Sequence, residues 1–198
     1  MLNAGADFAT PNNTTLVNKG IGRNYGLEIT LEKFMSKGFY FLVTGSLFQS
    51  QYQGSDKVWR STAFNGLYVV NALAGYQYLF GGKKNKTKRH TLSIDMKMTG
   101  AGGRYYTPID VAASDAQNTQ VLIDSLAYTE KYRDYFRLDL KLSYRISFKK
   151  VTQEFSMDLQ NVANIKNIFR KVYNPRTNTL NNEYQQGLFI LPQYRILF

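Results

Sequence analysis

The chain has 198 residues, which is room for one domain or for one piece of a larger protein. It has no cysteine and one histidine, His90, which excludes a disulfide scaffold, an iron–sulfur cluster, a zinc ribbon and a site built from several histidines. It carries 25 Lys and Arg residues against 14 Asp and Glu residues, a formal net charge of +11, and its 43% of apolar residues is too high for a disordered chain.

Neither a membrane helix nor a signal peptide is predicted. No run approaches the ~18 consecutive apolar residues that a transmembrane helix needs. Residues 1–20 lack the basic start and the apolar region of a signal peptide, and Pro11, Asn12 and Asn13 also make this segment a poor strand.

Alternation of apolar and polar residues with a period of two is the main pattern along the chain. It is clearest over 134–148, where the residues from Phe136 to Phe148 place a row of apolar side chains on one face and a polar row on the other. The same pattern occurs over 25–31, 39–47, 68–80, 92–98, 155–159 and 188–198. We therefore predict an all-β chain with about seven long antiparallel strands.

Strand length and loop rhythm favour a membrane β-barrel over a soluble β domain. The predicted strands run to about 11–15 residues, whereas soluble strands have a modal length of about 5–6. Aromatic residues gather near the strand ends, as in membrane girdles. Short connections are expected at 35–38, 81–89 and 149–153, and long polar ones at 51–66, 101–133 and 166–186. Short turns on one side and long loops on the other are typical of outer-membrane barrels.

About seven strands do not complete a bacterial barrel, which has an even strand number and no open edge. We therefore predict an antiparallel transmembrane β-barrel segment, an incomplete barrel in which residues 1–198 form the C-terminal part of a longer chain. Met1 would then lie inside a longer gene.

Several stretches resemble a known family. Two of them, NKGIGRNYGLEITLEKF and FYFLVTGSLFQSQYQGSDKVWRSTAFNGLYVVNALAGYQYLFG, resemble late barrel strands of TonB-dependent outer-membrane receptors of the Bacteroidetes type. EFSMDLQNVANIKN is similar to the family's penultimate strand, which ends in D-x-x-N-x-x-N, here Asp158, Asn161 and Asn164. YNPRTNTL and the closing YRILF extend the resemblance over roughly residues 16–198.

The resemblance implies a receptor in the bacterial outer membrane that takes up a scarce nutrient, such as a metal chelate, a peptide or a glycan. Its barrel would have about 22 strands around an N-terminal plug, and the plug and the N-terminal strands are absent from this sequence. Contact with the TonB complex would run through that missing part. A surface lipoprotein is a possible partner, and the terminal Phe198 is similar to the signal that barrel-assembly machinery reads.

Two sets of residues follow as site predictions. Polar residues on the inward faces of the strands would line the lumen: Glu28, Glu32, Asp95, Lys97, Arg137, Asp139, Lys141, Arg145, Glu154 and Asp158. Residues in the long loops would bind the ligand, because Trp, Tyr and Arg are common in binding hot spots: Trp59, Arg60, Tyr105, Tyr106, Tyr173, Arg176 and Tyr184.

No cofactor, metal site or nucleic-acid partner is expected. The basic run over 83–89 is interpreted as a solvated turn whose lysines reach lipid phosphates. No enzyme is expected either, because His90 has no evident nucleophile partner. Two alternatives stay open: a small self-contained outer-membrane barrel with a structural or adhesive role, and a soluble β-rich binding module.

Overall fold

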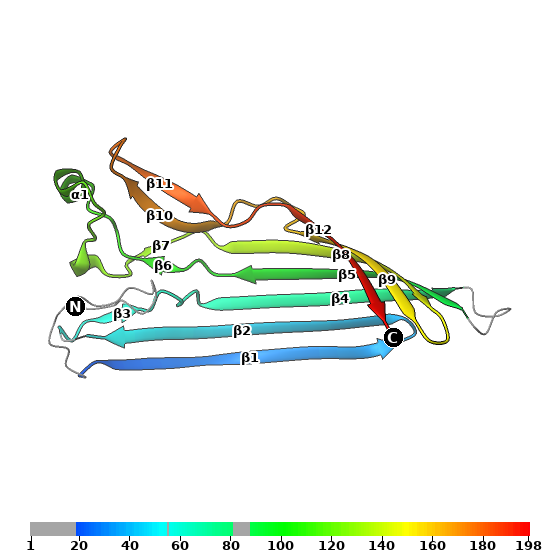
Figure 1. Ribbon diagram of the computed structural model, residues 1–198. Coiled ribbons are helices and arrows are strands. Elements are labelled where there is room, and N and C mark those ends of the chain that lie inside the picture. Colours follow the sequence, from blue (N-terminus) through cyan, green and yellow to red (C-terminus); the bar gives the residue numbers. More distant parts are fainter. Residues whose placement is uncertain (1–18, 55, 81–87) are drawn as a thin grey trace.

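The computed structural model describes residues 19–54, 56–80 and 88–198, and over these residues the chain is mostly antiparallel sheet (Figure 1). The prediction of an all-β chain with about seven long strands is confirmed. Residues 1–20, which the sequence predicts to be a poor strand, lie almost wholly outside the described residues. Within the described ranges, no helix has the length and apolar character to cross a bilayer.

Seven strands follow one another as an antiparallel meander in the order β1-β2-β4-β5-β8-β9-β12. Their bounds are Ile21–Ser36 for β1, Phe39–Gln53 for β2, Tyr68–Phe80 for β4, Arg89–Ala101 for β5, Tyr135–Ser147 for β8, Thr152–Gln160 for β9 and Phe189–Leu197 for β12. The short strand β3 (Trp59–Ser61) pairs with the end of β2. Strands β1 and β12 are the two edges, so the described sheet is open and not closed into a barrel.

The connections alternate between the two ends of the sheet, as the sequence predicts (Figure 1). At one end, β1 turns into β2 through Lys37 and Gly38, both at positive φ, which suits a two-residue hairpin turn. Residues 148–151 connect β8 to β9 at the same end. Most of the predicted short connection at 81–89 lies outside the described residues.

The three long connections lie at the opposite end and contain secondary structure that the sequence pattern did not reveal (Figure 1). The first contains β3. The second holds β6 (Tyr105–Tyr106), α1 (Val111–Gln117), the 3₁₀ turn η2 (Asp124–Leu126) and β7 (Glu130–Lys131), and the third holds the hairpin of β10 (Ile168–Asn174) and β11 (Thr179–Tyr184).

The strand register gathers the apolar residues on one face of the whole sheet. One row runs across five strands through Leu31, Val43, Ala72, Met98 and Leu138. The next row towards the short turns runs across six strands through Phe41, Ala74, Met96, Leu140, Leu159 and Ile190. A shift of one residue in any pairing would move a strand's apolar set to the other face, so the sequence alternation excludes such a shift.

The few buried apolar side chains of the described part lie among the long connections and not against the apolar face of the sheet. Ala63, Ala127 and Tyr128 form this cluster, and Tyr52 and Tyr105 pack against it. The Tyr52 and Tyr128 rings meet edge to face with their centroids 6.3 Å apart. The long connections are therefore a packed layer on the end of the sheet.

Candidate ligand-binding site at the loop end

Two glycines of the second long connection let it pack closely against its neighbours. A Cβ atom on Gly102 would lie 1.7 Å from the backbone oxygen of Gly66, and one on Gly103 would lie 1.9 Å from that of Tyr132. No real Cβ atom comes so near an oxygen, so both positions require glycine. The Gly103 amide also donates to Asp134 Oδ1 at 2.9 Å, which ties the start of the connection to its end.

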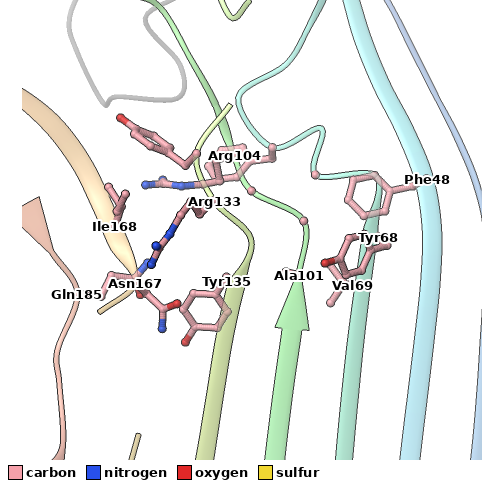
Figure 2. A pocket seen from close by; sticks show the side chains of 15 residues that line it. Phe48, Tyr68, Val69, Ala101, Arg104, Arg133, Tyr135, Asn167, Ile168 and Gln185 are labelled. Atoms are coloured by element: carbon pink, nitrogen blue, oxygen red, sulfur yellow. The ribbon is translucent and has the colours of Figure 1, made fainter. Parts of the chain in front are cut away.

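A cavity of about 420 Å³ lies directly beside this close contact (Figure 2). Its floor is the loop end of the sheet, where Phe48, Val69, Ala101 and Tyr135 lie on the face opposite the apolar rows. The remaining walls come from the long connections and the end of β4: Phe64, Gly66, Tyr68, Gly102, Gly103, Arg104, Tyr132, Arg133, Asn167, Ile168 and Gln185. We call this the inner cavity.

A second cavity of similar volume lies among the long connections themselves. It shares Phe64, Arg104 and Tyr132 with the inner cavity, so the two adjoin through these side chains. Its other lining residues are Ala63, Tyr105, Tyr106, Thr107, Ile109, Gln120, Leu122, Tyr128, Phe169, Arg170 and Lys171. We call this the outer cavity.

Arg104 stands where the two cavities meet. Its guanidinium donates to the backbone oxygen of Phe169, and its Cζ lies 6.0 Å from the Phe64 ring centroid and 5.7 Å from that of Phe169. The aromatic contacts hold the planar group in place. A guanidinium has five N–H donors, so the carbonyl of Phe169 leaves most of them for a ligand.

Tyr106, Tyr132 and Lys171 form one wall of the outer cavity. The Tyr106 and Tyr132 rings are stacked with centroids 4.2 Å apart, and Lys171 Nζ donates to the Tyr106 hydroxyl at 2.6 Å. The Lys171 amide donates to the Tyr132 hydroxyl at 3.0 Å. Burial raises the pKa of Tyr132, so its phenol stays protonated at neutral pH. The Lys171 side chain is therefore hydrogen-bonded to one tyrosine of the stack and its backbone amide to the other.

The carboxylate nearest in sequence to Arg133 is engaged elsewhere. Asp134 accepts a 2.6 Å hydrogen bond from the Tyr68 hydroxyl and the bond from Gly103, and Lys131 Nζ lies 3.7 Å away. The Tyr68 bond and the Gly103 bond hold the pKa of Asp134 below its usual value of 3.8. None of the described residues that line the two cavities is a carboxylate, so the local charge is positive.

Two of the predicted ligand residues line the outer cavity, and the others lie elsewhere. Tyr105 and Tyr106 belong to its wall. Trp59 is 37% exposed and packs against Arg23 of β1. The Arg23 Cζ atom lies 4.3 Å from the centroid of the Trp59 ring. Arg60 forms an ion pair with Asp56 at 2.6 Å.

The third long connection holds the remaining predicted ligand residues. Tyr173 is buried, and its hydroxyl donates to Asn178 Oδ1 at 3.1 Å, which makes it part of the β10–β11 hairpin core. Arg176 is exposed in the turn of that hairpin, and Tyr184 ends β11 with Lys166 Nζ 6.0 Å from its ring centroid. None of the three lines the inner or outer cavity.

The sequence patterns did not predict Tyr132 or the basic residues Arg104, Arg133 and Lys171, which with Arg170 supply the positive charge of the two cavities. A weak signal exists: the second long connection begins with Gly-Gly-Arg at 102–104 and ends with Arg-Asp at 133–134. Close packing at the base of a loop brings such residues together. Lys171 had no signal, because only the fold of the β10–β11 hairpin brings it to Tyr106.

The polar residues predicted to line a lumen share the face that bears the inner cavity. Three ion pairs lie on it, Arg145–Glu154 at 2.6 Å, Arg137–Asp139 at 2.7 Å and Lys141–Asp158 at 3.7 Å. Asp95 accepts from Tyr40, and Lys97 pairs in register with Asp139. Glu28 and Glu32 lie exposed on the edge strand β1.

No family model, curated protein or solved structure matches this chain. Among the described residues there is no group of three or more His, Cys, Asp or Glu side chains that could hold a metal ion. The terminal Phe198 is 98% exposed directly after β12.

Proposed function

We propose that this chain is the C-terminal wall of an outer-membrane β-barrel, of the TonB-dependent receptor type that its sequence resembles. Its long connections would face the outside of the cell and its short turns the periplasm. The function would be energised uptake of a scarce nutrient, with ligand capture at the loop end. Contact with the TonB complex and closure of the barrel would come from parts of the protein outside these residues.

The observation that carries the proposal is the exposed apolar face of the sheet. Many large apolar side chains on this face are 40–65% exposed, among them Leu27, Ile29, Leu47, Ile94 and Leu142. A soluble protein rarely leaves a continuous apolar surface larger than a few hundred Å² uncovered. Lipid would cover the face without any further protein layer.

A row of aromatic residues crosses this face near the short turns. Tyr78 pairs across β5 through Leu92 with Tyr144, and the row continues to Phe155 and Tyr194. The Phe155 and Tyr194 rings lie 4.7 Å apart. Amphipathic rings in one row are typical of a membrane interface.

A second level of aromatic residues lies near the loop end, and the distance between the two levels gives the height of the apolar band between them. Tyr68 is ten residues before Tyr78 on β4, which is about 34 Å along a strand. At the tilt of about 40° found in such barrels, that length corresponds to a band of about 25 Å. This matches the apolar thickness that an outer-membrane barrel presents to lipid.

The open sheet supports a larger assembly over a self-contained small barrel. Both β1 and β12 pair on one side only within the described part of the chain. An unpaired strand edge in lipid costs several kcal/mol for each polar group, so these edges need further strands. Additional strands from a longer chain would satisfy both edges.

Cysteine labelling on whole cells in a cysteine-free background tests the orientation, and residues 1–198 themselves contain no cysteine that would have to be replaced. In the full protein, Ala112→Cys lies on the exposed surface of α1 and Lys150→Cys lies in the short turn between β8 and β9. A membrane-impermeant maleimide is expected to label Ala112→Cys on intact cells and Lys150→Cys only after the outer membrane is opened.

A third variant controls for lipid cover. Met96→Cys lies in the apolar row and is expected to resist the reagent in both preparations. Equal labelling of the loop and turn positions on intact cells, or recovery of the protein in the soluble fraction, would contradict the proposed location. Loss of ligand uptake when the TonB complex is deleted would then test the energised step.

A further inference from the structure

We propose that the joined inner and outer cavities bind a small organic anion, one that presents a carboxylate or phosphate group to Arg104 and Arg133 and a ring to the stacked tyrosines. We build this inference on the proposed function, because it names the class of ligand that the receptor would capture at its loop end.

The inner cavity is positively charged. Arg104 and Arg133 line one cavity, and Figure 2 shows both side chains reaching towards the wall formed by Ile168 and Asn167. Two guanidinium groups in one cavity repel each other, and no acidic residue lines it within the part of the chain that the structure describes. The neighbouring carboxylate of Asp134 is held by Tyr68 and Gly103. An anion between the two arginines would relieve the repulsion.

The hydrogen-bond donors of the inner cavity have the geometry that an oxyanion needs. A guanidinium presents a planar fork that matches the two oxygens of a carboxylate or phosphate, which a lysine does not. Arg104 is fixed by the Phe169 carbonyl and lies near the Phe64 and Phe169 rings, so little rotamer freedom remains to be lost on binding. Half-buried aromatic walls lower the local dielectric and strengthen such a bond.

The space beyond Arg104 is the outer cavity. The outer cavity continues past the shared side chains to the Tyr106–Tyr132 stack, and Lys171 adds a third positive charge to its wall. Each cavity has a volume of about 420 Å³, within the range of pockets for small ligands. A ligand with one anionic group and one ring would therefore place the anion beside the arginines of the inner cavity and the ring beside the tyrosines of the outer cavity.

Phenyl phosphate is a suitable probe, with benzyl alcohol as the neutral ring and inorganic phosphate as the ringless anion. Binding to the full protein in detergent is measured by calorimetry. Phenyl phosphate is expected to bind at least tenfold more tightly than either control. Arg104→Gln and Arg133→Gln are each expected to weaken it by roughly tenfold or more, because each variant loses a charge-assisted hydrogen bond to the anion.

Arg89→Gln is the matched control. It removes the same charge from an exposed arginine at the start of β5, at the opposite end of the sheet. Its affinity for phenyl phosphate is expected to equal that of the native protein. Equal weakening by all three variants would reduce the effect to net charge and overturn the site, and so would equal binding of phenyl phosphate and benzyl alcohol.

A second measurement needs no variant and so does not depend on folding of a mutant. Phenylglyoxal modifies accessible arginines, and mass spectrometry reports each one. Phenyl phosphate is expected to protect Arg104 and Arg133 and to leave Arg89 reactive. No protection of the pair at saturating probe would overturn the proposal.

The test of anion binding and the test of the proposed membrane location can fail independently of each other. Whole-cell labelling of Ala112→Cys and Lys150→Cys reports the membrane location without any ligand. A protein with the expected labelling but no anion binding refutes only this inference. A protein that binds the anion but is soluble refutes the membrane receptor and keeps the anion site.

Discussion

The hydroxyl of Tyr40 donates a 2.5 Å hydrogen bond to Asp95 Oδ1 across an intervening strand. Tyr40 lies on β2 and Asp95 on β5, and the residue between them in the register is Gly75 of β4. A Cβ atom on Gly75 would lie 2.3 Å from the Asp95 oxygen and 2.4 Å from Tyr40 Cζ. The phenol ring therefore crosses the sheet in the space that glycine leaves open, and three strands are joined on the polar face.

Gly75→Ala is expected to destabilise the protein by about 1–3 kcal/mol, because the added methyl group must displace the Tyr40 ring and break its bond to Asp95. Urea unfolding in detergent, followed by tryptophan fluorescence, measures the free energy of unfolding. Gly45→Ala is the control, since a Cβ atom there meets nothing within 4 Å. A loss as large at Gly45 as at Gly75 would show that steric contact is not the cause.

Leu140→Arg tests which face meets lipid. Leu140 lies in the apolar row between Met96 and Leu159, midway between the two aromatic levels. An arginine there is expected to cost about 2–4 kcal/mol of unfolding free energy in lipid vesicles. Ser143→Arg, placed between Ser93 and Ser156 on the polar face, is expected to cost much less. Equal costs at both positions would contradict a lipid-facing apolar face.

Asn161 is expected to be the main anchor of the third long connection. It is 1% exposed and at φ 51°, its Nδ2 donates to the backbone oxygens of Ile165 and Gln186, and its Oδ1 accepts from the Ile165 amide. Asn161→Ala would leave buried backbone groups unpaired, at a cost of about 1–3 kcal/mol for each.

Limited proteolysis of the β10–β11 hairpin provides the measurement for Asn161. Cleavage within residues 168–184 is expected to be faster in Asn161→Ala than in the native protein. Asn161→Gly tolerates the positive φ, so it separates the lost hydrogen bonds from backbone strain. Asn182→Ala, at an exposed position on β11, is the control. Unchanged cleavage in Asn161→Ala would contradict the anchoring role.

Acid is expected to loosen the second long connection through Asp134. The Tyr68 hydroxyl, the Gly103 amide and Lys131 lower the pKa of Asp134 in the folded protein below 3.8. Its stabilising contribution is therefore complete above pH 3.8 and is lost as the pH falls through the lower, folded-state value.

Hydrogen exchange of the Gly103 amide, expressed as a protection factor, follows this loss. Protection is expected to fall below pH 3.8 in the native protein. Asp134→Asn is expected to have lower protection that does not change with pH over that range. A native and a variant profile of the same shape would show that another group titrates.

The alternation of apolar and polar residues determined the strands and the two faces of the sheet. This was possible because strand side chains alternate with a period of two. A slip of one residue would place all the polar side chains of a strand on the apolar face. The run from Phe136 to Phe148 is an example, since its two rows became two faces. The lengths of the connections also determined which end of the sheet would carry each of them.

Only the tertiary structure decided what the long connections build. Arg104 and Lys171 are 67 positions apart in the chain, yet both line the outer cavity. Their approach depends on backbone contacts such as Gly66 with Gly102, and on the hydrogen bonds of Asn161, none of which has a sequence period. Loop packing is set by individual non-local contacts, and for that reason Trp59, Arg60 and Arg176, chosen by residue type, lie apart from the cavities.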